Sequence, residues 1–206
     1  SDLFFEYVSR DERATYFEDF YTGVVLFQHQ VDFLTKINWP YAYTLNVDDG
    51  IEKNSDFNPT LPYHKFRRPK TSKRILYKLH GDAEYESKYI DKIQDNIVFS
   101  QSQYLQAITS EDNTDIYKAL LADYAQEHLL FIGCSLQEER DLQFVYDKSK
   151  SSQKDAYRIV LRNEIPSSQE QRNLKKHGIN EIILVENYEN FYTDFLLAYQ
   201  EYQTEN

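Results

Sequence analysis

Two short segments decide the fold: residues 41–50, YAYTLNVDDG, and residues 75–82, ILYKLHGD. Each begins with an apolar or aromatic run of strand-forming residues and ends in polar residues. That pattern is typical of a buried strand that leads into a loop. The sequence therefore predicts strands over Tyr41–Leu45 and Ile75–Leu79, each with polar side chains at its carboxyl end.

The other elements alternate between helices and strands. Apolar residues three and four apart predict two helices within Leu3–Asn38, broken near Gly23, and a loop is expected over Asn54–Arg74. Further strands are expected at Asn96–Phe99, Leu129–Ile132, Tyr157–Leu161 and Ile179–Val185. One further helix is expected where Ile116, Leu120 and Tyr124 mark a single face, and others are expected at Ser100–Ile108, Asp141–Lys148, Ser167–His177 and Tyr188–Tyr202. Short apolar strands alternating with helices predict an α/β fold with a Rossmann-like parallel sheet covered by helices on both faces.

Length and composition limit the class of protein. A chain of 206 residues fits one domain with a single core. The 23 basic against 34 acidic side chains give a net charge of -11, which argues against nucleic acid and anionic membranes as partners. The single cysteine, Cys134, excludes a disulfide framework and a cysteine zinc module, so we expect a cytoplasmic protein without a zinc module.

Ligands of open parallel sheets bind outside the carboxyl ends of the strands. Asn46 and Asp48 follow the first predicted strand, His80 and Asp82 follow the second, and Ser135 follows the strand before Cys134. We expect these strand ends to converge on one crevice. Two other interpretations stay open: the segment 46–49 caps a helix that begins at Gly50, and His80 is an ordinary turn histidine.

Four motifs carry a family resemblance. Thr44-Leu45-Asn46-Val47-Asp48-Asp49 resembles the Thr-x-Asn-x-Asp signature of sirtuin-like domains, and Lys78-Leu79-His80-Gly81 resembles the segment with that family's catalytic histidine. Gly133-Cys134-Ser135, with Asp141 further on, is similar to the family's Gly-x-Ser turn that holds the dinucleotide. Ile97-Val98-Phe99-Ser100 with Tyr104 resembles the segment after the histidine in bacterial members.

The resemblance implies NAD as the ligand and assigns a role to each matching residue. His80 would act as the general base near the nicotinamide ribose, and Asn46 would position the ribose or the attacking water. Asp48 would contact the nicotinamide carboxamide or orient neighbouring groups, and Ser135 with Gly133 would approach ribose and phosphate oxygens. Thr44 and Gly81 are the other cofactor-binding positions within the motifs, and Asn163, after the strand that ends at Leu161, resembles the family residue that contacts the adenine ribose. No metal is expected, because the paired Asp48 and Asp49 lack a further ligand at the required spacing.

The sequence also departs from the family pattern. Leu45 stands where protein-deacylating members usually have Gln, and the zinc cysteines are missing. The resemblance is therefore to bacterial sirtuin-like domains of anti-phage defence proteins, which hydrolyse NAD. No Gly-x-Gly turn occurs among the five glycines, so we expect residues 1–206 to be one domain that lacks the upstream Gly-rich segment and hydrolyses NAD poorly alone.

Two further points concern partners. The segment His64–Arg74 contains six basic residues and no acidic residue, which suits NAD phosphates, an acidic partner or a solvated loop. The resemblance also allows a catalytically inactive domain that senses a nucleotide or binds a regulatory protein or a second copy. His29, His64, His128 and His177 carry no motif and are expected to be structural or exposed.

Overall fold

The computed structural model describes residues 2–62, 74–88, 97–98, 103, 114–137, 139–152 and 155–205. The chain divides into two compact units, the first of residues 1–116 with 199–206 and the second of residues 117–198. A single domain over residues 1–206 stays a prediction. None of the described helices combines the length and the apolar character needed to cross a membrane.

The first unit begins with three helices, α1 (Asp2–Tyr7), α2 (Arg10–Tyr21) and α3 (Gln28–Lys36), rather than the predicted two. The additional break has a local cause in Ser9. The Ser9 hydroxyl accepts a hydrogen bond from the Glu12 backbone N–H, and the Glu12 carboxylate accepts one from the Ser9 N–H at 3.0 Å. This capping box starts α2 and separates it from α1. The predicted break near Gly23 is confirmed, because α2 ends at Tyr21.

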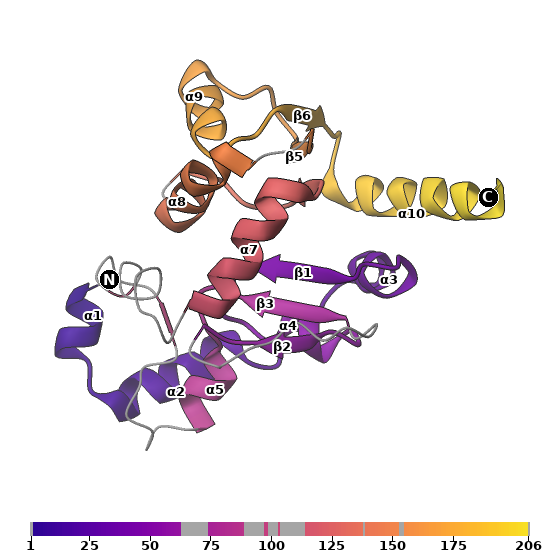
Figure 1. The fold of residues 1–206 in the computed structure, drawn as a ribbon. Helices are drawn as coiled ribbons and strands as arrows, with labels where there is room; N and C mark the ends of the chain where they lie inside the picture. The colour runs from indigo at the N-terminus through magenta and orange to yellow at the C-terminus, as the bar shows by residue number, and fades with distance from the viewer. Residues whose placement is uncertain are drawn as a thin grey trace. The chain divides into compact units, whose positions relative to one another are not determined.

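A three-stranded parallel sheet forms the centre of the first unit (Figure 1). Its order is β1 (Tyr41–Thr44), β3 (Ile75–Lys78) and β2 (Asn58–Thr60). The middle strand β3 is buried at every position. The edge strand β2 lies inside the segment predicted as loop, which is a correction. It contains Pro59, whose missing N–H is tolerated at a sheet edge. Because proline is rare in strands, the sequence pattern of this segment predicts a loop.

Two short helices, α4 (Gly50–Lys53) and α5 (Ala83–Lys88), follow β1 and β3. A core cluster of Phe17, Val47, Ala83 and Ile97 joins α2 to the segments that follow these strands. Ile97 makes an isolated antiparallel bridge with Gly81 instead of the predicted parallel strand. Asn96 and Phe99 of that predicted strand, the following motif residues Ser100 and Tyr104, and nearly all of the predicted helix 100–108 lie outside the described residues.

The second unit contains another three-stranded parallel sheet, in the order β4 (Leu129–Phe131), β5 (Arg158–Arg162), β6 (Glu181–Leu184). Its helices are α7 (Thr114–Gln126), which begins in the first unit, α8 (Arg140–Ser149), the 3-10 turn η2 (Lys150–Ser152), α9 (Ser168–Lys176) and α10 (Tyr188–Glu205), which ends in the first unit. Tyr124 on α7 is fully buried, and its hydroxyl donates to the His177 carbonyl oxygen. The edge strand β6 is exposed along its length, so the expectation of a fully covered sheet fails there.

The fold class predicted from the sequence is confirmed: parallel strands alternate with helices in a Rossmann-like α/β arrangement. Among the residues that the structure describes, the strands pair in two groups of three, one in each unit.

Candidate functional site

Asn46 and His80 follow the carboxyl ends of neighbouring parallel strands. β1 and β3 pair in parallel from Tyr41 with Ile75 to Thr44 with Lys78, and the Leu79 N–H extends this ladder to the Thr44 carbonyl oxygen at 3.0 Å. Asn46 is exposed, and its side-chain amide has no hydrogen-bonding partner in the described part of the chain. The His80 side chain is buried, with 4% of the residue's surface exposed. The two residues thus lie at the same end of the sheet.

Gly81 shapes the turn that carries His80. Its φ of +89° lies in the left-handed region, which glycine adopts without a steric penalty. Its N–H donates to the Lys78 carbonyl oxygen at 3.2 Å, and the His80 carbonyl oxygen accepts from the Val98 N–H at 2.9 Å. The backbone on both sides of His80 is therefore held by hydrogen bonds.

The first motif also caps a helix, as the alternative interpretation expected. The Asp48 carboxylate accepts a hydrogen bond from the Gly50 N–H at 2.9 Å, and α4 begins at Gly50. A side chain at Gly50 would displace this carboxylate, because its Cβ would lie 2.9 Å from that same Asp48 oxygen. One of the two oxygens expected to contact nicotinamide therefore already accepts a backbone hydrogen bond.

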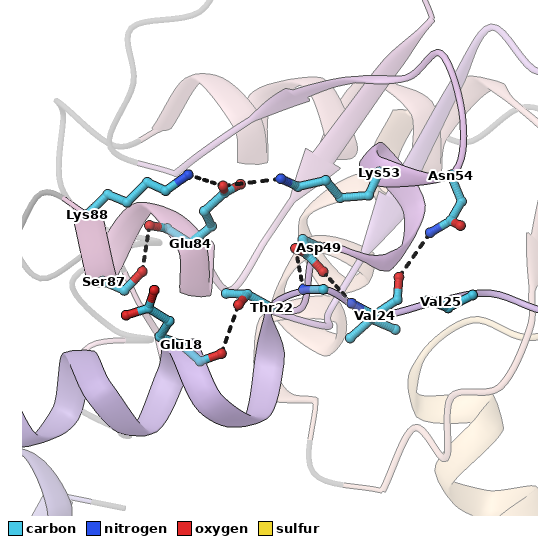
Figure 2. Close-up of a pocket in the computed structure, with 11 residues that line it drawn as sticks. Glu18, Thr22, Val24, Val25, Asp49, Lys53, Asn54, Glu84, Ser87 and Lys88 are labelled. Atoms are coloured by element: carbon cyan, nitrogen blue, oxygen red, sulfur yellow. Dashed lines mark hydrogen bonds and ion pairs between the residues drawn. The ribbon is translucent and has the colours of Figure 1, made fainter.

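Asp49 holds a distant loop in place. Its carboxylate is buried and accepts hydrogen bonds from the Gly23 N–H at 2.7 Å and the Val24 N–H at 2.9 Å (Figure 2). Asn54 donates from its side-chain amide to the Val24 carbonyl oxygen at 3.0 Å. Asp48 and Asp49 thus accept hydrogen bonds from backbone N–H groups of two different segments.

A cavity of about 420 Å³ adjoins this loop and is lined by residues of α2, α4 and α5 (Figure 2). Its two lysines, Lys53 and Lys88, both donate to the Glu84 carboxylate, with Lys53 at 3.2 Å. The hydrogen bond from Lys88 is the main cause that lowers the pKa of the Glu84 carboxyl, and the contact with Lys53 lowers it further. Because Glu84 pairs with both ammonium groups, a phosphate would have to displace it.

Lys78 links the segment that follows β1 to the segment that follows β3. Its ammonium group is fully buried and donates to the Asp48 carbonyl oxygen at 2.6 Å and more distantly to the Val47 carbonyl oxygen at 3.4 Å. It also forms ion pairs of 2.5 Å with the carboxylates of Glu52 and Asp82. Neither Glu52 nor the role of Lys78 was predicted from the sequence. The available signal was a lysine at the end of an otherwise apolar strand, with an acid four residues later.

The second unit brings together the other predicted positions. Gly133 and Ser135 follow β4, and Asn163 follows the neighbouring parallel strand β5. Gly133 has a φ of +69° with open space where a Cβ would lie, and Arg162 donates to the Ser135 carbonyl oxygen at 3.1 Å. These residues lie at one end of the second sheet, while their convergence with Asn46 and His80 stays a prediction.

Strain and burial mark the turn after β4. Leu136 has a φ of +55° although it is not glycine, and its side chain is fully buried. A leucine in this region costs about 1–2 kcal/mol, a strain that is concentrated at functional sites in proteins. Burial raises the pKa of the Cys134 thiol to about 11, so this cysteine is not a ready thiolate nucleophile.

Arg74 and three histidines have structural partners. The Arg74 guanidinium donates to the carbonyl oxygens of Leu34 and Ile37 at the end of α3 and pairs with Asp56 at 2.6 Å. Arg74 therefore caps a helix. Residues 64–73 lie outside the described residues, so the three alternatives for the basic segment stay predictions. The described histidines without a motif are structural as expected: His177 contacts two carbonyl oxygens, His128 accepts from the Tyr157 N–H and His29 stacks on Phe27.

A comparison with known families agrees with this fold. The SIR2-like domain family matches residues 2–182, which is most of the chain. The chain therefore belongs to the SIR2-like domain family, whose members typically bind NAD. No curated protein matches the sequence.

Proposed function

We propose that this SIR2-like domain binds NAD and transfers its ADP-ribosyl group to water, releasing nicotinamide. The observation that carries the proposal is the position of Asn46 and His80, which follow neighbouring parallel strands where ligands of such sheets bind. The amide of Asn46 has no described partner, so it is available to hold a ribose hydroxyl or a water molecule. Gly133, Ser135 and Asn163 would contact the rest of the dinucleotide.

The reaction requires little beyond positioning and a base. The C1′–N bond breaks with its electron pair passing to the pyridinium nitrogen, so nicotinamide leaves as a neutral molecule. Water forms the new bond to C1′ and loses a proton to His80, which yields ADP-ribose. The transition state resembles an oxocarbenium ion, and a carboxamide oxygen from Asn46 would stabilise it and direct the water. The biological setting we propose is NAD depletion in the cytoplasm of a bacterium under viral attack.

A second function has one observation in its favour. His80 is only 4% exposed, although a general base must reach its water or ribose hydroxyl. A domain that binds a nucleotide without cleaving it would tolerate this burial. In that case the chain would act as a nucleotide sensor or a protein-interaction module, with a regulatory protein or a second copy as partner.

Nicotinamide release separates these two functions. NAD is incubated with the 206-residue chain and with the protein extended by any residues encoded before Ser1, and nicotinamide and ADP-ribose are measured by chromatography. The extended protein should release nicotinamide, and His80→Ala or Asn46→Ala should reduce the rate by about 10²–10⁴. His29→Ala on α3 is the matched control. Folded His80→Ala protein with an unchanged rate would refute the proposal, whereas NAD binding without any nicotinamide would favour the sensor.

A further inference from the structure

The buried Lys78 ammonium group connects both segments that carry the proposed catalytic residues. It donates to the Asp48 and Val47 carbonyl oxygens in the segment after β1 and to Asp82 in the segment after β3. The Ala83 N–H donates to the Val47 carbonyl oxygen at 2.9 Å and joins the same two segments a second time. Lys78 is therefore placed to fix the distance between the segments.

The charges around Lys78 do not balance. One ammonium faces two carboxylates, Glu52 and Asp82, whose side chains are each 10% exposed. Both carboxylates lie 2.5 Å from the same nitrogen, so their bonded oxygens are at most twice that distance apart. A buried excess negative charge is costly, and one additional proton would remove it.

The two carboxylates differ in how well they are hydrogen-bonded. Both oxygens of Asp82 have partners: one accepts from Lys78 and the other from the Tyr85 N–H at 2.7 Å, at the start of α5. The second oxygen of Glu52 is buried and has no partner among the described residues. Burial raises the pKa of the Glu52 carboxyl, and Lys78 opposes part of this rise. Glu52 is thus the better place for the proton.

We propose that Lys78, Glu52 and Asp82 form a positioning centre in which the two carboxyl groups share one proton and Lys78 holds the segments of Asn46 and His80 in register. The inference that this centre serves catalysis rests on the proposed function. A cavity of about 280 Å³ adjoins the centre, and Glu84, Tyr85 and Lys88 of α5 line it. Glu84 and Lys88 form an ion pair with each other, so the net charge that faces the centre is small.

Three substitutions test the centre, and Lys53→Met is the control because Lys53 forms an ion pair with its side chain 49% exposed. Glu52→Gln keeps an acceptor for Lys78 and places an N–H donor where the proton would sit. Asp82→Asn weakens the bond to Lys78, and Lys78→Met leaves two carboxyls without their cation. We expect Lys78→Met and Asp82→Asn to lower kcat for nicotinamide release by about tenfold or more at similar KM, because catalysis is sensitive to small misplacements. Glu52→Gln should lower kcat clearly less than these two substitutions.

Two further measurements do not depend on activity. Amide hydrogen exchange at Ala83 should be faster in Lys78→Met and Asp82→Asn than in Glu52→Gln. The shared proton contributes to the free energy of unfolding of the wild type. This contribution is fully present below the usual carboxyl pKa and is lost as pH rises through the raised pKa of Glu52. Glu52→Gln should therefore gain stability relative to the wild type as pH rises above the usual carboxyl pKa.

If the difference in the free energy of unfolding between Glu52→Gln and the wild type stayed constant as pH rises above the usual carboxyl pKa, the shared proton would be overturned. Equal losses of kcat in Lys53→Met and Lys78→Met would overturn the positioning role. If the wild-type protein released no nicotinamide, the proposed function would fail, and the exchange and stability results would decide on the centre by themselves.

Discussion

Removal of the Asp49 carboxylate should loosen the loop after α2. This carboxylate accepts hydrogen bonds from the Gly23 and Val24 N–H groups at 2.7 and 2.9 Å and is nearly inaccessible to solvent. Hydrogen bonds to charged groups contribute about 1.5–3 kcal/mol each, and water can replace part of that at a half-buried loop. Asn54 still holds Val24 from the other side. We therefore expect Asp49→Ala to lower the free energy of unfolding by about 3 kcal/mol.

The assay is urea unfolding followed through Trp39, the only tryptophan of the chain, which packs against Phe33 in the same unit as Asp49. With a denaturant slope of about 1–3 kcal/mol/M, the midpoint should fall by about 1–3 M. Asp32→Asn on α3 is the matched control, since it changes an exposed ion pair with Lys36. Equal midpoints for Asp49→Ala and Asp32→Asn would refute the reasoning, as would unchanged amide exchange at Gly23.

Two other predictions concern the second unit. Gly178→Ala should destabilise this unit far more than Gly133→Ala. Both glycines have positive φ, but only at Gly178 would a Cβ lie 2.3 Å from the Tyr146 ring. Gly133→Ala should lower the free energy of unfolding by about 1–2 kcal/mol in thermal or urea unfolding, and an equal loss in both variants would contradict the packing argument. Ser167→Ala should cost about 0.5–2 kcal/mol by removing the capping box with Glu170. Hydrogen bonds from Ser167 lower the pKa of Glu170, so this stabilisation is present above the usual carboxyl pKa and lost as pH falls, and the two proteins should converge in acid.

Local sequence determined the strands and the ends that carry the candidate residues. Apolar runs before polar clusters identified β1 and β3, and the motifs placed Asn46 and His80 directly after them. Such patterns are informative because a buried strand must be apolar on both faces in a parallel sheet. A local signal for the additional helix break was also present in Ser9 and Glu12, at capping-box spacing.

Tertiary structure decided what the polar residues of those segments bind. The sequence alone does not distinguish Asp48, which caps α4, from Asp49, which holds a loop 25 residues away along the chain. The role of Lys78 depends on Glu52, whose position beside it follows from how α4 packs against the end of β3. Local patterns record burial and turns, whereas these contacts join residues that are distant in sequence, so only the folded chain determines them.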